Sequence, residues 1–171
     1  DLEGPSAEIY TMLGTVYKEM EEYELGLKYF QKATKLEVLS DQAWFGAGNC
    51  LAKLDRWYEA VHFYNKALKI NTGNGLYWMA MAEADYKVGN LISSIDAYEE
   101  AAMLVPGNID IWLAWSYIYF EQGDLETAAF RGSKNPVFPC PVPSLVIVPP
   151  AYEERVNTRG LRQLHMPFGH V

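Results

Sequence analysis

Apolar and small side chains recur along most of the chain at intervals of three and four residues, and short polar breaks separate one run from the next. In the first run Tyr10, Leu13 and Tyr17 share one face of a helix, and after a break at Glu21 a second run carries Phe30 and Ala33. Intervals of three and four are typical of amphipathic helices. The pattern therefore predicts two helices of about 14 residues joined by a turn.

The same pattern returns every 34 residues, so residues related by this step form columns. Four columns keep their character: aromatic at Tyr10, Trp44, Trp78 and Trp112; small at Gly14, Gly48, Ala82 and Ser116; aromatic at Phe30, Tyr64 and Tyr98; and alanine at Ala33, Ala67 and Ala101. Further breaks fall at 55–56, 71–75, 89–90, 106–108 and 123–124. A fixed period with helical spacing inside each unit predicts a solenoid of helix-turn-helix pairs.

Glycines inside the predicted helices indicate how closely these helices pack. Glycine in a helix costs about 1 kcal/mol relative to alanine, so Gly14 and Gly26 in one unit need a packing reason. We expect the two backbones to approach closely there, with Tyr17 and Phe30 filling the space beside them.

These columns, with Pro106 at the end of a second helix, resemble the tetratricopeptide repeat (TPR) family. The resemblance covers residues 7–130, with repeats at 7–40, 41–74 and 75–108 and a truncated repeat at 109–130 that loses the pattern after Phe130. It implies an all-α, right-handed TPR superhelix that acts as a scaffold for other proteins rather than as a catalyst.

One column of the first helices departs from the family pattern. Tyr17, Leu51 and Tyr119 are apolar or aromatic, but the third repeat has Asp85. Because a buried unpaired charge is costly, we expect the neighbouring Tyr86 to take the aromatic role after a small rotation, with a functional carboxylate as the alternative.

Residues 131–171 form a segment of different composition, which holds seven of the nine prolines. Pro136, Pro139, Pro141 and Pro143 exclude a helix, so an extended, Pro-rich C-terminal tail is expected. Two explanations stay open: the tail folds back over the exposed end of the solenoid, or it is a foreign or frameshifted ending.

The charge distribution narrows the class of partner. Residues 1–130 hold 9 basic and 20 acidic side chains, a balance of −11, whereas residues 131–171 hold 5 and 2, a balance of +3. An acidic body argues against nucleic acid, which requires clustered Lys and Arg, and favours basic peptides. No apolar stretch reaches the length of a membrane span, and Cys50 and Cys140 leave the compartment open, with the cytoplasm slightly favoured.

The resemblance also implies a binding groove, because in the family the first helix of each repeat lines the concave side. The corresponding groove positions are Thr11, Thr15, Lys18, Phe45, Asn49, Met79, Glu83, Tyr86, Leu113, Tyr117 and Phe120. Aromatic residues at helical spacing are commonly core, which we expect of the Trp44 column. Phe45, Met79 and Leu113 are better candidates for contact with a ligand, since their neighbours already fill the inward face.

Some family members grip a chaperone's C-terminal carboxylate with Lys, Asn and Arg, but only Asn49 matches that clamp here. The positions for basic residues hold Thr11, Phe45, Leu76, Asp110 and Ala114. The expected ligand is therefore an apolar or aromatic, and also basic, protein or peptide, with Asn49 available to a ligand backbone amide.

Catalytic and cofactor motifs are not found in the sequence. His62 is expected at the surface, and His165, His170 and Cys140 lack the paired ligands of a zinc site, so no metal or cofactor is predicted. The sequence predicts a protein-interaction scaffold. The alternative is a structural or oligomerisation segment of a longer solenoid, self-associating through the end exposed after Phe130.

Overall fold

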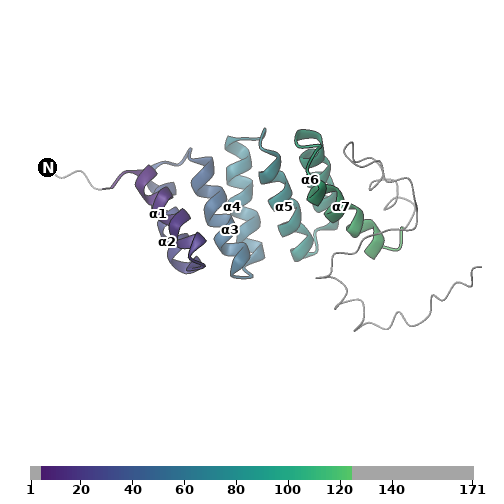
Figure 1. Cartoon of the computed structure of the whole chain (residues 1–171), viewed down its shortest axis with the longest axis horizontal. Helices are drawn as coiled ribbons and strands as arrows, with labels where there is room; N and C mark the ends of the chain where they lie inside the picture. Colours follow the sequence, from purple (N-terminus) through teal and green to yellow (C-terminus); the bar gives the residue numbers. More distant parts are fainter. Residues whose placement is uncertain (1–4, 125–171) are drawn as a thin grey trace, which may run out of the picture. The chain divides into compact units, whose positions relative to one another are not determined.

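The computed structural model describes residues 5–124, and all regular structure in this range is helical. The elements are α1 (Ala7–Glu19), α2 (Tyr23–Leu36), α3 (Asp41–Lys53), α4 (Trp57–Ile70), α5 (Gly75–Val88), α6 (Leu91–Leu104) and α7 (Ile109–Glu121). Figure 1 shows them following one another in chain order. The all-α class and the helix-turn-helix pairs predicted from the sequence are confirmed.

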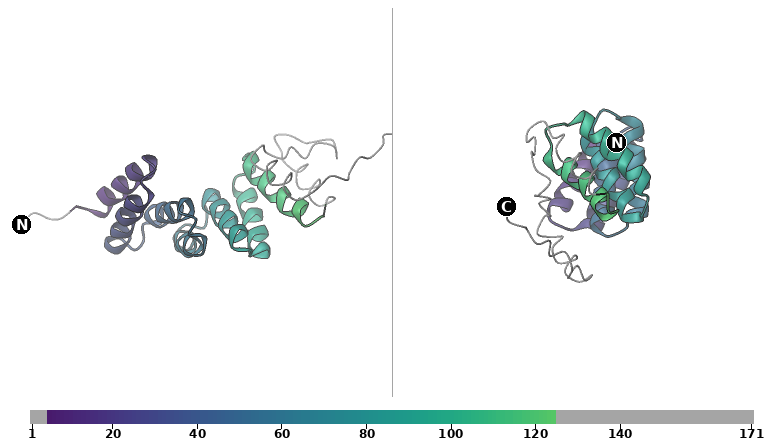
Figure 2. Two further views of the ribbon diagram at one scale, coloured as in Figure 1. Left: turned by 90° about the horizontal axis from the view of Figure 1, so that it is seen from below. Right: turned by 90° about the vertical axis from the view of Figure 1, so that its right-hand side faces the viewer.

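Each helix packs against its neighbours in the chain, and a second set of contacts joins alternate helices. Besides the consecutive pairs, α1 contacts α3 and α3 contacts α5. The hydrogen bond from Tyr86 on α5 to Glu121 on α7 extends this series, so the odd-numbered helices form a row of their own. Figure 2 shows the same helices from two further directions. This row carries the first helix of every predicted repeat.

The small-residue columns let aromatic rings reach the helix backbones. A Cβ atom at Gly14 would lie 2.8 Å from the Phe30 ring, and one at Gly46 would lie 2.4 Å from the same ring. One at Gly26 would lie 3.2 Å from the carbonyl oxygen of Gly14. The close approach of α1 and α2 predicted from Gly14 and Gly26 is thus confirmed, and Phe30 fills the space between α1 and α3.

The second helix pair repeats this packing, which gives a direct test. A Cβ atom at Gly48 would lie 2.6 Å from the ring of Tyr64, itself buried. Gly48→Leu should therefore overpack the contact between α3 and α4 and lower stability by about 1–3 kcal/mol in thermal melts. Lys53→Leu, on an exposed position of the same helix, is the matched control and should change the melting temperature little. Equal melting temperatures for Gly48→Leu and the parent would contradict this packing.

The connections before the first helices of the pairs carry two kinds of hydrogen bond that the sequence did not predict. The N-cap side chains at the 34-residue step are Ser6, Ser40, Asn74 and Asn108, and each accepts a hydrogen bond from a backbone N–H of its helix. The indole Nε1 atoms of Trp44, Trp78 and Trp112 donate to carbonyl oxygens six residues earlier, at 2.8–2.9 Å. These tryptophans are half-buried rather than fully buried. The column packs against the core, as expected, and its indole N–H groups in addition tie α3, α5 and α7 to the connections that precede them.

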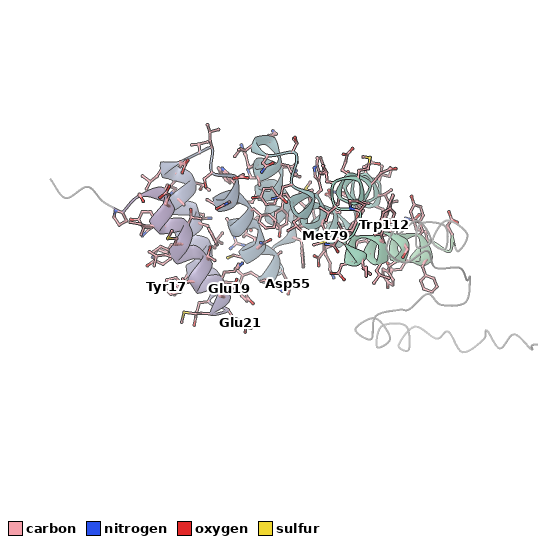
Figure 3. All side chains as sticks on the ribbon, turned by 45° about the horizontal axis from the view of Figure 1, so that its top comes forward. Tyr17, Glu19, Glu21, Asp55, Met79 and Trp112 are labelled. Carbon is pink, nitrogen blue, oxygen red and sulfur yellow. The ribbon has the colours of Figure 1, made fainter. Side chains whose placement is uncertain are left out.

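The turns inside the pairs lie where the sequence predicts them and require a left-handed backbone. Positive φ occurs at Glu21 (63°), Asp55 (58°), Gly89 (88°) and Gly123 (79°), again at a step of 34 residues. Figure 3 labels Glu21 and Asp55, each at the turn that follows an odd-numbered helix. Non-glycine residues are strained in this conformation because Cβ approaches the carbonyl oxygen.

Glu21 offers a clean test of that strain. Its side chain is exposed, whereas Asp55 Oδ1 accepts a hydrogen bond from Trp57 Nε1 at 3.2 Å. Glu21→Gly should raise stability by about 0.5–1 kcal/mol in denaturant unfolding, since glycine adopts positive φ without a Cβ clash. Gly89→Ala is the reciprocal variant and should lower stability. A destabilised Glu21→Gly would mean that its side chain makes a contact that outweighs the strain.

The third pair corrects the sequence-based expectation for Asp85. Its carboxylate lies in the apolar column itself, with only 2% of the residue exposed, while Tyr86 stays half-buried beside it. Asn90 Nδ2 donates to Asp85 Oδ1 at 3.1 Å, and burial raises the pKa of Asp85. The rotation that would bring Tyr86 into the core does not occur, because the amide of Asn90 partly offsets the cost of burying the carboxylate.

The first helix exposes an apolar stripe whose counterparts in later helices are buried. Ile9 and Val16 are 47% and 52% exposed. The residues 34, 68 and 102 positions later are buried. They are Ala43, Tyr77 and Ile111 in the column of Ile9, and Cys50, Ala84 and Ile118 in the column of Val16. The second helix of the preceding pair packs against these later helices.

Several predictions made from the sequence fall outside the described residues. These are the end of the truncated repeat at Phe130, the Pro-rich tail at 131–171, Cys140, and the pair His165 and His170.

Candidate functional site

The candidate groove residues lie on the odd-numbered helices. Their distribution is Thr11 and Thr15 on α1; Phe45 and Asn49 on α3; Met79, Glu83 and Tyr86 on α5; and Leu113, Tyr117 and Phe120 on α7. Thr15, Glu83 and Leu113 are exposed and the others are half-buried. Figure 3 labels Met79 on α5 among the surrounding side chains. Their role in binding remains a prediction.

The best-organised part of this row is an aromatic cluster between α3 and α5. The ring of Phe45 stacks on Tyr77, with centroids 4.3 Å apart, and lies 5.6 Å from the ring of Tyr64. Tyr64 Oη donates a 2.8 Å hydrogen bond to Asn49 Oδ1. The cluster is therefore built by one half-buried ring resting on two buried ones, so the Phe45 ring is already held in place.

Asn49 is less available than the sequence suggests, since its carbonyl oxygen is engaged by Tyr64. Its amide Nδ2 can still donate to a ligand carbonyl. Burial, followed by the nearby charge of Glu83, raises the pKa of Tyr64, which keeps its hydroxyl protonated as a donor to Asn49. Burial and the Asp41 carboxylate likewise raise the pKa of Tyr77 to about 12, and its hydroxyl donates to Asp41 Oδ2 at 3.2 Å.

A second cluster links α5 to α7 through one carboxylate. Tyr86 Oη and Tyr117 Oη both donate to Glu121, the latter at 2.5 Å to Oε1. The Tyr117 ring lies 6.4 Å from that of Phe120. Three of the groove candidates are thus brought together around Glu121, a residue that the sequence reading did not select.

The polar side chains at the α1 end of the row already have partners within their own helix. The hydroxyls of Thr11 and Thr15 donate to carbonyl oxygens one turn earlier in their own helix, at 2.9 and 3.0 Å. Lys18 pairs with Glu19 at 2.9 Å. The polar groups at this end are therefore occupied locally, and the aromatic surface begins at Phe45.

Sequence reasoning missed Tyr77 and Glu121 for identifiable reasons. Tyr77 shares its column with Ala43 and Ile111, so it reads as core, and it is indeed buried under Phe45. Glu121 is an exposed acidic residue at a helix end, where nothing in its spacing distinguishes it. The sequence did select Tyr86 and Tyr117, whose hydroxyls both donate to the Glu121 carboxylate, and these two tyrosines were the available indication of this cluster.

Other candidate chemistry finds little support in the part of the chain that the structure describes. His62 is exposed, as expected, and Cys50 is buried, which raises the pKa of its thiol to about 11 and disfavours the thiolate. Residues 5–124 contain no group of His, Cys, Asp and Glu placed to hold a metal ion. In the same range no helix has both the length and the apolar character that a membrane crossing requires.

Comparison with known families and structures agrees with the repeat geometry. Residues 11–75 match the family model of the tetratricopeptide repeat. Residues 11–75 therefore belong to the tetratricopeptide repeat family. A comparison with curated protein sequences gives no match.

Solved structures place the TPR fold on a wider part of the chain. The crystal structure of MamA superposes with a TM-score of 0.73 at 20% identity, covering 75% of this chain and 75% of that one. MamA 41-end from Desulfovibrio magneticus RS-1 gives 0.72 at 19% identity, covering 75% and 73%. YrrB, a TPR protein with an unusual peptide-binding site, gives 0.67 at 20% identity, covering 73% and 64%. At these identities the likeness supports the fold, a TPR solenoid.

Proposed function

We propose that this TPR protein is a protein-interaction scaffold that holds a peptide or protein segment against the row of odd-numbered helices. The observation that carries the proposal is the Phe45 cluster, in which a half-buried aromatic ring is stacked 4.3 Å from the buried ring of Tyr77. Rings that are ordered before binding lose little entropy when a ligand covers them, which is the property of interface anchors. No catalytic role is proposed.

The same row indicates the chemistry of the segment. Phe45, Met79, Leu113, Tyr117 and Phe120 supply apolar and aromatic surface, which suits an apolar or aromatic ligand side chain. Glu83 and Glu121 add negative charge on α5 and α7. We infer a ligand that combines aromatic or aliphatic anchors with basic residues, and whose backbone carbonyl accepts from Asn49.

Selection from a displayed library of random peptides tests this proposal. Peptides that bind the full chain should be enriched in aromatic and basic residues. Phe45→Ala, Met79→Ala and Tyr117→Ala should each weaken them by about tenfold, with unchanged far-UV circular dichroism. Binding is measured by fluorescence anisotropy.

Lys69→Ala on α4 is the matched control, because this side chain is exposed on an even-numbered helix. It should leave the affinity unchanged. If Lys69→Ala weakens the selected peptides as much as Phe45→Ala does, the row of odd-numbered helices is not the binding surface.

A second candidate function rests on the apolar stripe of α1. Ile9 and Val16 occupy columns that are covered in later pairs by the preceding second helix, so the α1 stripe has the character of a repeat-to-repeat interface. We propose that this face stacks on a second helix of another repeat, which corresponds to a structural or oligomerisation role. Ile9→Lys with Val16→Lys should abolish concentration-dependent self-association in light scattering. If the parent chain is itself a monomer at all concentrations, it does not self-associate through this face.

A further inference from the structure

A cavity of about 520 Å³ lies between α5 and α6, on a different set of side chains from the groove row. Trp78, Met81 and Asp85 line it from α5, and Asp96, Ala97 and Glu100 line it from α6. None of Met79, Glu83 and Tyr86 contributes to it. The pocket is therefore separate from the site of the proposed function.

Comparison with the first two helix pairs explains why this space is open in the third. In the first pair the Tyr29 ring stacks on Tyr17 at 5.2 Å, and in the second the Phe63 ring lies 5.4 Å from Trp44. The residue at the same step in the third pair is Ala97. An alanine leaves empty the volume that an aromatic ring occupies in the earlier pairs, so the pocket is produced by the loss of that ring.

The first pair also shows what kind of group occupies this location. Lys32 Nζ lies over the Tyr10 ring, 5.2 Å from its centroid, and 5.1 Å from that of Tyr29. In the third pair, Trp78 occupies the position that corresponds to Tyr10, and Glu100 occupies the position that corresponds to Lys32. The third pair thus keeps the aromatic wall and replaces the resident ammonium by a carboxylate. Indole is the strongest cation–π partner among the aromatic side chains.

The inner wall of the pocket is a buried carboxylate. Asp85 is 2% exposed and stands where the earlier pairs have Tyr17 and Leu51. Asn90 donates to its Oδ1, and among residues 5–124 no other hydrogen bond to this carboxylate is found. Its second oxygen is therefore available to a donor entering the cavity. A buried carboxylate with spare acceptor capacity is stabilised by a cation, which offsets its desolvation.

The charge of the surrounding helix face reverses in the same repeat. The second helices of the first two pairs carry Lys28, Lys32 and Lys35, and His62, Lys66 and Lys69, at the steps where α6 has Asp96, Glu100 and Met103. Among the three helix pairs of residues 5–124, the aromatic wall, the buried carboxylate and the acidic rim thus occur together in the third. From these observations we propose that the pocket between α5 and α6 binds the ammonium group of a lysine side chain from a basic partner peptide.

In this arrangement the ligand ammonium takes the location that Lys32 Nζ occupies over Tyr10. It lies against the Trp78 ring, donates to the free oxygen of Asp85, and is attracted by Asp96 and Glu100 at the rim. The aliphatic stem of the lysine fits beside Ala97 and Met81. A metal ion is a poorer occupant, because no metal-ligating group of three acidic, His or Cys side chains is found within residues 5–124.

Titration of the full chain with a synthetic peptide carrying one lysine between Gly-Ser flanks tests the proposal. Nitrogen-15 correlation spectra report on the indole N–H of Trp78, which is held by the carbonyl oxygen of Thr72. The lysine peptide should shift this signal in a saturable manner. A peptide with norleucine in place of lysine should not, because it keeps the stem but lacks the ammonium.

Three variants, of which the first two restore features of the earlier pairs, should each weaken the lysine peptide by at least about tenfold. Ala97→Phe fills the cavity with the residue of the second pair, Glu100→Lys supplies an internal ammonium as Lys32 does, and Asp85→Asn removes the buried charge. Glu8→Lys on α1 is the matched control for a charge change of two units and should change the affinity less than twofold. The signals of Trp44 confirm the fold in each variant.

Three results would overturn the proposal. They are equal shifts with the norleucine peptide, unchanged affinity in Ala97→Phe, and an equal loss in Glu8→Lys, which would show general attraction to an acidic protein. Self-association of the chain that is lost in the same variants would assign the ammonium to a second copy rather than to a partner. Phe45→Ala should leave the titration unchanged, so failure of the groove proposal is recognised separately.

Discussion

Replacing Phe30 by alanine should lower the free energy of unfolding by about 3–5 kcal/mol, the range for a large buried aromatic side chain. Phe30 is 2% exposed, and its ring fills the space that Gly14 on α1 and Gly46 on α3 leave open. Without the ring, both glycines face a void that the backbones are too rigid to close. Because adjacent pairs stabilise each other in a solenoid, the loss should also loosen the contact of the first pair with the second.

A double-mutant cycle isolates the contact between Phe30 and Gly46. Gly46→Ala alone should lower stability by about 1–3 kcal/mol, since its Cβ would lie 2.4 Å from the ring. In the Phe30→Ala background the same change should be neutral or stabilising by about 0.5–1 kcal/mol, because the methyl group enters the void and alanine favours helix. Urea unfolding measures both values. An equal cost of Gly46→Ala in the two backgrounds would show that the ring is not what excludes a side chain.

The pairing of helices could be predicted from the sequence because each packing rule uses side chains at a fixed step. Gly14 and Phe30 are visible as columns, and a glycine inside a helix indicates close contact. The turns could likewise be located from their polar breaks. Their left-handed conformation was visible only at Gly89 and Gly123, since Glu21 and Asp55 adopt it against their own preference.

The helices that carry the candidate residues could be predicted from the sequence, but the contacts between those residues could not. Helical spacing places Phe45 and Asn49 on one row, yet it does not show that Tyr64 uses the carbonyl oxygen of Asn49 or that Tyr77 lies under Phe45. These contacts join residues 15 and 32 positions apart, so they depend on the distance between helices. Periodicity shows which residues share one face of a helix. It does not show which side chains of the neighbouring helices contact that face.

The expectation that Tyr86 replaces Asp85 in the core was wrong because it considered a single column of the repeat. A carboxylate in an apolar column looks like an error that Tyr86 should correct, and burial of the charge is indeed unfavourable. The compensating features lie elsewhere in the same pair: Asn90 in the turn and Ala97 on α6, which opens the cavity. A binding pocket can be distinguished from a packing defect only when four columns are compared together. In the third pair these columns hold Trp78, Asp85, Ala97 and Glu100.

Asp85→Leu should raise stability by about 2–4 kcal/mol at neutral pH, because it removes a buried carboxylate and restores the apolar residue found at Leu51. The gain should come with loss of the lysine peptide, since the variant also removes the acceptor inside the pocket. Higher stability with lower affinity is the expected outcome when an unfavourable buried charge is retained for binding. The free energy of unfolding is measured in urea.

The pH dependence of this gain identifies the charge as its cause. Burial raises the pKa of Asp85 above its ordinary value, so the folded state binds the proton more tightly than the unfolded state. The free energy of unfolding of the parent is therefore higher below the ordinary pKa of an aspartate. This added stability is lost as the pH rises through the raised pKa of Asp85 in the folded state. The advantage of Asp85→Leu should be smaller at about pH 4 than at about pH 7. Asp85→Asn keeps the shape and should show little of this pH dependence, whereas a constant difference between Asp85→Leu and the parent at both pH values would attribute the gain to packing alone.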